Sequence, residues 1–191
     1  HMPVHGPLVL GTYGRFDPAK GYAHLIREFR ALGPDCNMIL RIGGFGPLEE
    51  ELRALAAGAT NIEFCGKVTD AAQFHAGCHV FIVPSRNESY GQVANEAREA
   101  GRPIVVSRAG GLPEQVGSAG LVVDCSVAGP LRDALRSLPQ LPLEAMGRSG
   151  RAATANCGPE RASQWGQLLT SFGNSPLNHA RHRLRLAPHA G

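Results

Sequence analysis

Short runs of apolar residues alternate along this chain with longer segments whose apolar residues recur at helical spacing. The run PLVLGT at 7–12 has the length of a strand, whereas the segment 22–32 places Leu25, Ile26 and Phe29 on one face of a helix. Strands that are apolar throughout and alternate with helices are typical of a parallel sheet covered on both faces. The sequence therefore predicts an α/β fold, with a Rossmann-like parallel sheet of about six strands and helices on both faces.

The same spacing rules predict the remaining elements. Further strands are expected at 37–42, 61–64, 79–83, 103–106 and 120–123, and further helices at 48–57, 70–77, 90–100, 130–138, 143–155 and 159–172. In an open parallel sheet, ligands bind beyond the carboxyl ends of the strands. Candidate functional residues are therefore expected in the segments that follow the strands.

The chain has 191 residues, 43% of them hydrophobic, which suffices for one core. Residues 1–2 are typical of the remnant of a cleaved affinity tag, residues 3–173 form the predicted domain, and residues 174–191 are expected to be a basic, flexible tail. The tail contains three of the 19 basic side chains and none of the 16 acidic ones, so the remaining chain is formally neutral. This neutrality argues against a nucleic-acid partner. The alternating Arg and Leu of the tail would suit a weak contact with a membrane surface, or pairing with a strand of a partner.

Membrane-spanning segments and metal sites are not indicated. No apolar run approaches the ~20 residues that span a bilayer. The five cysteines include no C-x-x-C pair, so neither a disulfide framework nor a zinc site is predicted. His75 and His79 have a spacing that could hold a metal on one helix, but the predicted helix ends near Gly77. We expect a soluble, cytoplasmic protein, peripheral to the membrane at most, that needs no metal or cofactor.

Two cations follow the first predicted strand, in the segment GTYGRFDPAKG at 11–21. Arg15 and Lys20 flank an Asp-Pro turn, and a helix is predicted to begin directly after it. Two cations beside a helix N-terminus form a place for a diphosphate. Basic loop residues are also common on protein surfaces, so this segment by itself is equally consistent with ordinary solvated side chains.

Two glutamates, Glu88 and Glu96, lie in the segment PSRNESYGQVANEA that follows the strand at 79–83. Their separation along a helix is at most ~12 Å, roughly the span from a sugar to a ribose across a diphosphate. Carboxylates suit such ligands because each oxygen accepts hydrogen bonds from sugar hydroxyls. The amides of Ser89–Gly91, at the expected helix start, would stabilise phosphate oxygens. Taken singly, each glutamate is also consistent with a helix cap or a solvated helix residue.

Two glycine-rich turns follow other strands. The segment GGFGP at 43–47 contains a G-x-G, but Glu49 replaces the third glycine of a dinucleotide fingerprint. We interpret this segment as a close backbone approach, which makes a nicotinamide-dependent dehydrogenase the least favoured function. The segment AGGLPE at 109–114 would let the backbone approach a ligand, or would form an ordinary turn.

Taken in order, these motifs resemble the C-terminal, donor-binding domain of retaining GT-B glycosyltransferases of the group 1 family (family 4). The resemblance runs from about Leu8 to Phe172. It is carried by GRFDPAKG, GGFGPLEEEL, FCGKVTD, PSRNESYGQVANEAREAGRPIV with its E-x7-E spacing, and GGLPEQV. It implies one half of a GT-B fold. It also implies an enzyme that transfers a hexose from a nucleotide-diphosphate sugar to a saccharide or lipid-linked acceptor, as in polysaccharide biosynthesis, with retained anomeric configuration.

The resemblance also implies roles for individual residues. The implied catalytic residues are Glu88, which would hold sugar hydroxyls, and Arg15 and Lys20, which would bind the donor diphosphate. Glu96 would hold the ribose hydroxyls. The other implied donor-binding residues are Ser89, Tyr90 and Gly91, whose amides would support the phosphates and the sugar, and Val68 and Asp70, which would lie against the nucleotide base. No metal or cofactor is implied, because cationic side chains and amides would stabilise the leaving diphosphate.

Members of that family have a second, N-terminal domain that binds the acceptor, and no counterpart of it is found in this sequence. We therefore expect the chain to be inactive by itself, and to be either an excised part of a longer enzyme or the partner of a second polypeptide. A non-catalytic nucleotide-sugar-binding subunit is accordingly one alternative function. Half of a sugar-nucleotide epimerase is the other, although the E-x7-E spacing together with Arg15 and Lys20 disfavours it.

Overall fold

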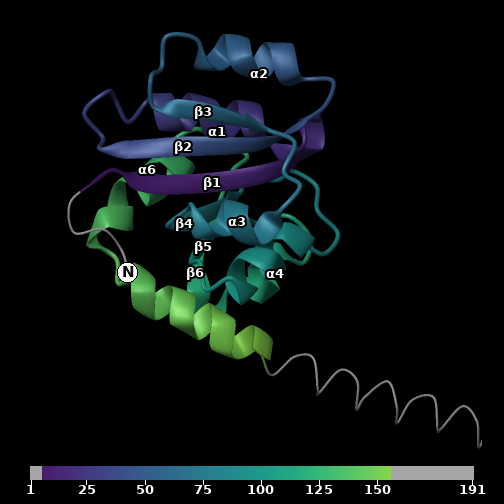
Figure 1. The fold of residues 1–191 in the computed structure, drawn as a ribbon, viewed down its shortest axis with the longest axis vertical. Coiled ribbons are helices and arrows are strands. Elements are labelled where there is room, and N and C mark those ends of the chain that lie inside the picture. The colour runs from purple at the N-terminus through teal and green to yellow at the C-terminus, as the bar shows by residue number, and fades with distance from the viewer. Residues whose placement is uncertain (1–5, 156–191) are drawn as a thin grey trace, which may run out of the picture. The chain divides into compact units, whose positions relative to one another are not determined.

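The computed structural model describes residues 6–155 (Figure 1). The predictions for the tag remnant at 1–2, the helix at 159–172 and the tail at 174–191 lie outside the described residues. Six strands form one sheet in the order β3-β2-β1-β4-β5-β6, and every neighbouring pair is parallel. The strands are β1 (Leu8–Arg15), β2 (Met38–Phe45), β3 (Ile62–Gly66), β4 (Val80–Val83), β5 (Ile104–Ser107) and β6 (Gly120–Val123). The predicted Rossmann-like sheet is confirmed.

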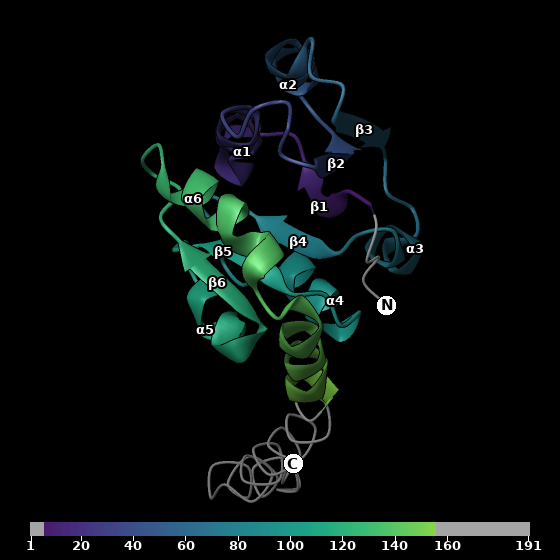
Figure 2. The ribbon, with the colours of Figure 1, turned by 90° about the vertical axis from the view of Figure 1, so that its left-hand side faces the viewer.

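Helices cover both faces of this sheet (Figure 2). One face carries α1 (Tyr22–Arg30), α2 (Glu49–Ala56) and α6 (Pro130–Ser137). The other face carries α3 (Ala71–Ala76), α4 (Gln92–Glu99) and α5 (Leu112–Val116). Short 3₁₀ turns lie at Pro18–Lys20, Gly117–Ala119 and Leu138–Gln140, and residues 143–155 are helical.

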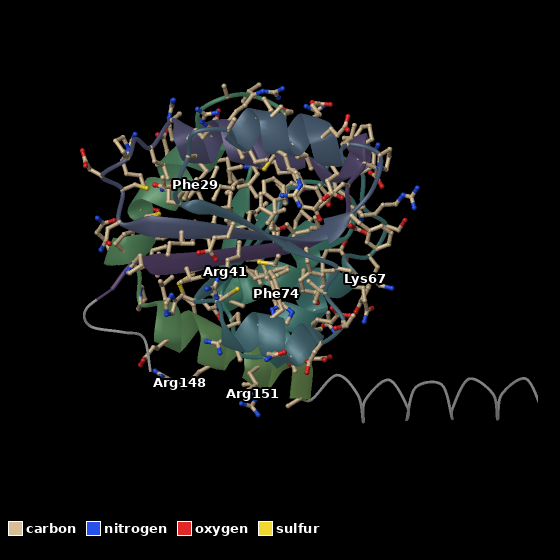
Figure 3. All side chains as sticks on the ribbon, turned by 45° about the horizontal axis from the view of Figure 1, so that its top comes forward. Phe29, Arg41, Lys67, Phe74, Arg148 and Arg151 are labelled. Carbon is tan, nitrogen blue, oxygen red and sulfur yellow. The ribbon has the colours of Figure 1, made fainter. Side chains whose placement is uncertain are left out.

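The core consists of two apolar layers separated by the sheet. Strand β4 shows why: Val80 and Ile82 belong to the layer under α1, whereas Phe81 and Val83 belong to the layer under α4. Because successive side chains of a strand point to opposite faces, a strand that is apolar throughout can serve both layers. Figure 3 shows Phe29 and Phe74, one from each face, on opposite sides of the strands.

Two strands are longer than predicted, because glycines were interpreted as strand ends. Strand β1 runs to Arg15 and β2 to Phe45, three residues beyond the expected ends, and Gly14 pairs with Gly44. A Cβ at Gly44 would lie 1.9 Å from the carbonyl oxygen of Gly14, so only glycine permits this approach. The interpretation of the GGFGP segment as a close backbone approach is confirmed.

The strand order places β1 and β4 at the centre of the sheet, where the chain changes direction. After β1 the chain builds the sheet outward through β2 and β3, and it then returns to the other side of β1 with β4. In open α/β sheets of this order, the crevice outside the carboxyl ends of these two strands is the usual ligand site.

Candidate functional site

The loops after β1 and β4 are held together by their backbones. The amide of Arg86 donates to the carbonyl of Ala19 at 2.7 Å, and the amide of Asn87 approaches the same carbonyl at 3.3 Å. Gly21 has a φ of 72°, and a Cβ there would lie 2.1 Å from the carbonyl oxygen of Pro84. The left-handed glycine therefore lets the two loops meet above the crevice.

Lys20 and Glu88 form an ion pair at this meeting point, with 2.8 Å between Nζ and Oε2. Their side chains are 30% and 14% exposed, so the carboxylate is largely withdrawn from water. Burial by itself would raise the pKa of Glu88, but the hydrogen bond and charge of Lys20 outweigh it. With help from the Gly91 amide and the Ser85 hydroxyl, they hold the pKa of Glu88 below its ordinary value. Two predicted site residues are thus brought together, and Glu88 is ionised.

Arg15 lies at the end of β1, and its side chain is 68% exposed. Its Nε is 4.0 Å from a carboxylate oxygen of Asp17, a distance at which the guanidinium is only weakly held. The other oxygen of Asp17 accepts from the Ala19 amide at 2.9 Å and fixes the turn. Arg15 therefore presents a cation to solvent at the same rim as Lys20.

The segment Ser89–Gly91 precedes helix α4, which begins at Gln92 and not at residue 90 as predicted. The reason is Gly91, which has a left-handed conformation with a φ of 83° and is the N-cap of the helix. The Gly91 backbone also contributes to lowering the pKa of Glu88, so it lies close to this glutamate. Ser89 and Tyr90 are exposed at the rim.

The GGLPE turn after β5 supports this segment from behind. The Gly111 amide donates to the Ser89 carbonyl at 3.3 Å, and the Gln115 side-chain amide donates to the Tyr90 carbonyl. A Cβ on Gly110 would lie 1.6 Å from the Glu88 carbonyl oxygen. The close approach made by this turn is to the backbone of the Glu88 loop, and its predicted approach to a ligand stays a prediction.

Glu96 lies on α4, and its Oε2 accepts a hydrogen bond from the Tyr13 hydroxyl. That hydroxyl is also 3.1 Å from Nε2 of His75, which is 1% exposed. Sequence reasoning did not identify Tyr13, and a strand that also contains Thr12 and Arg15 gives no clear signal for it. It assigned His75 a structural or surface role, and the burial of its side chain supports the structural one. Helix α3 ends at Ala76, so His75 and His79 do not share a helix.

Val68 and Asp70 line a hollow of about 240 Å³ in the loop between β3 and α3. Asp70 caps α3, because one of its carboxylate oxygens accepts from the Gln73 amide at 2.9 Å. Phe74 of α3 lies behind this hollow and packs edge-on against Tyr13, with 5.2 Å between the ring centroids. The predicted base position and Glu96 are therefore linked through a continuous packed cluster.

The candidate site does not lie in the most voluminous of the hollows described here. A hollow of about 750 Å³ lies at the amino ends of β1 and β2, and none of the predicted site residues lines it. Among residues 6–155, no three His, Cys, Asp or Glu side chains gather closely enough to hold a metal ion. No helix within the same range is long and apolar enough to cross a membrane.

Curated relatives of this chain are bacterial glycosyltransferases. It is 35% identical over 140 residues to a D-inositol 3-phosphate glycosyltransferase of Acidothermus cellulolyticus, a match that covers 64% of this chain and 31% of the relative. It is 34% identical over 160 residues to a GDP-mannose-dependent mannosyltransferase of Corynebacterium glutamicum that acts on a monoacylated phosphatidylinositol monomannoside. That match covers 75% of this chain and 42% of the relative, so the chain spans less than half the length of either protein.

Solved glycosyltransferase structures share the fold. Sucrose-phosphate synthase from Thermosynechococcus elongatus matches with a TM-score of 0.76 and 28% identity, over 91% of this chain and 47% of that protein. Anabaena HepE, solved in complex with UDP, matches with a TM-score of 0.78 and 22% identity, over 87% of this chain and 49% of HepE. The family model described as glycosyl transferases group 1 matches residues 7–140, which is more than half of the chain. This chain therefore belongs to the group 1 glycosyltransferases.

Proposed function

We propose that this chain is the donor-binding domain of a retaining glycosyltransferase that moves a sugar from a nucleotide-diphosphate sugar to a saccharide or lipid-linked acceptor. The observation that carries the proposal is the pairing of Lys20 with Glu88 in the crevice between β1 and β4. A cation and a hydroxyl-binding carboxylate lie there side by side, as a sugar diphosphate requires.

Charge balance explains how the crevice would accept a diphosphate. In the structure the charge of Lys20 is matched by that of Glu88. An incoming diphosphate adds negative charge, and the exposed Arg15 guanidinium at the same rim supplies a second cation for it. As the bond between sugar and phosphate breaks, these two cations and the amides of Ser89–Gly91 would stabilise the charge on the leaving diphosphate. This part of the proposal assigns no step to a metal.

The two glutamates would divide the hydroxyl groups of the donor. Glu88, beside Lys20, is assigned the hydroxyls of the sugar, and Glu96, further along α4, those of the ribose. The hollow at Val68 and Asp70 is assigned the nucleotide base. Exposed backbone and side-chain groups of this loop would set the choice of base.

Transfer would need more than this chain, which spans less than half of the two curated relatives. We infer that the chain binds donor without turning it over, and that the acceptor is bound by a further domain or a partner chain. The second candidate is a nucleotide-sugar-binding subunit that has no catalytic role of its own. Addition of the rest of a relative's length, in cis or in trans, distinguishes the two, because only the donor half of an enzyme would then give transfer.

Calorimetric titration and thermal shift against UDP, GDP, ADP, CDP and NAD test the proposal. A ligand that binds only the folded state at a hundred times its dissociation constant raises the free energy of unfolding by about 2.7 kcal/mol. We expect one nucleoside diphosphate to do so and NAD to have no effect. Stabilisation by NAD alone, or by none of the five, would refute donor binding by this chain.

A further inference from the structure

Tyr13 connects two helices that the sequence separates widely. It lies in β1, its hydroxyl donates to Oε2 of Glu96 on α4, and Nε2 of His75 on α3 is 3.1 Å from the same hydroxyl. A phenol has one proton to donate. Since that proton goes to the carboxylate, His75 must be the donor in the other bond, which places its own proton on Nε2. The Nδ1 atom of His75 is buried without a hydrogen-bond partner among the described residues, so this tautomer leaves an unpaired acceptor there and not an unpaired N–H.

The surroundings hold this chain of hydrogen bonds in place. The Tyr13 ring packs edge-on against both Phe74 and Phe81, with 5.2 Å between centroids in each case. Burial lowers the pKa of His75 to about 4, so the imidazole is neutral at pH 7. Burial, followed by the bond to Glu96, raises the pKa of Tyr13, so the phenol keeps its proton. The direction of each hydrogen bond is therefore the same throughout the physiological pH range.

We infer that Tyr13 is a positioning residue, supported by His75, which fixes the Glu96 carboxylate so that one oxygen is held by the protein and the other accepts from the ribose hydroxyls. The inference rests on the proposed function and goes beyond it, because the family resemblance assigns no role to Tyr13 or to His75. It gives a function to a phenol that lies between α3 and α4.

The size of the effect follows from the freedom that Glu96 would regain. Without the phenol, the carboxylate turns among several rotamers and must be immobilised when the nucleotide binds. Ordering one such side chain weakens affinity by about two- to tenfold. Tyr13→Phe keeps the ring and its contacts with Phe74 and Phe81, and removes the hydroxyl alone.

The test is titration of the full chain with the nucleoside diphosphate that stabilises it and with the 2′,3′-dideoxy form of the same ligand. Tyr13→Phe should lower the affinity for the ribose ligand by about two- to tenfold and leave the affinity for the dideoxy ligand unchanged. In a Glu96→Gln background, Tyr13→Phe should have a smaller effect on binding of the ribose ligand than in the unmodified protein, and again none on the dideoxy ligand. Glu99→Gln, which changes an exposed carboxylate three residues further along α4, is the matched control and should alter neither affinity.

The outcomes separate the inference from the proposed function. If the unmodified chain binds the diphosphate and Tyr13→Phe binds it equally well, or loses both ligands equally, the positioning role is wrong and donor binding stands. If the unmodified chain binds no nucleoside diphosphate, both fail. NMR of the unmodified protein gives a readout that needs no variant. The Tyr13 hydroxyl and His75 Nε2 protons should persist when the nucleotide binds, and their loss on binding would overturn the inference.

Discussion

Replacing Lys20 with methionine would leave Glu88 as a carboxylate with 14% exposure and no cation beside it. Methionine keeps most of the length of the lysine stem, so the change removes a charge more than it removes packing. Breaking an exposed ion pair typically costs below about 1 kcal/mol, and breaking a buried one costs about 3–5 kcal/mol. The Lys20–Glu88 pair lies between these limits.

We expect Lys20→Met to lower the free energy of unfolding by about 1–3 kcal/mol at pH 7. For a chain of this length, that corresponds to a fall in Tm of about 3–10 °C. Arg136→Met is the matched control, because the Arg136–Asp133 pair has side chains that are 61% and 67% exposed. Such a surface pair contributes about 0.5 kcal/mol at most.

The effect of the substitution should depend on pH, with a sign that follows from Glu88. The folded-state pKa of this carboxyl lies below its ordinary value of 4.5, so the pair stabilises the protein above that pH. The stabilisation is lost as the pH falls through the folded-state pKa and Glu88 becomes protonated. The difference between Lys20→Met and the unmodified protein should therefore be greatest near pH 7 and should shrink below about pH 4.5.

Urea unfolding at pH 7 and at pH 4, with both variants, measures these quantities. Titration with a nucleoside diphosphate and with the bare nucleoside measures the effect on binding. Lys20→Met should lower the affinity for the diphosphate by about ten- to hundredfold and leave the affinity for the nucleoside unchanged. Equal losses of stability for Lys20→Met and Arg136→Met, or a loss that is the same at both pH values, would refute the reasoning about the pair.

Two further substitutions test the crevice. Glu88→Gln should lower the affinity for the nucleotide sugar more than that for the bare nucleoside diphosphate, because the amide has only one oxygen that can accept from sugar hydroxyls. Equal losses of affinity in titration would show that Glu88 does not contact the sugar. Gly21→Ala should destabilise the protein in urea unfolding by clearly more than Gly58→Ala. Both glycines have left-handed φ values, of 72° and 79°, but only at Gly21 would the new Cβ meet the Pro84 carbonyl oxygen. Similar losses for the two would mean that the loops do not need this close approach.

The sheet and its helices could be predicted because their signals are local. Strand β4 is apolar at every position, and α1 carries its apolar residues at helical spacing. A few consecutive residues therefore suffice to predict each element and its buried face. The strand ends were less predictable. Gly14 and Gly44 look like turn residues in isolation, and they extend the pairing because each stands opposite the other.

The candidate site was predicted in part for the same reason. The segments after β1 and β4 each carry polar residues at strand ends, so topology alone brings Lys20 and Glu88 to one crevice. The contact of Tyr13 with Glu96 joins positions 83 residues apart. No periodicity relates two such positions, because their contact depends on how α4 packs against the sheet. The nearness of the Gly91 backbone to Glu88 is likewise a matter of three-dimensional packing.

The central place of β1 also bears on how the chain matures during synthesis. Within this sheet β1 is synthesised before the other strands, yet one of its two edges stays open until β4, about 70 residues later, is available to pair with it. Open strand edges invite pairing with other chains, so a nascent or truncated product that ends before β4 would be prone to aggregate. Products that end before β4 should accordingly be less soluble than the full chain, and the crevice between β1 and β4 cannot form in them.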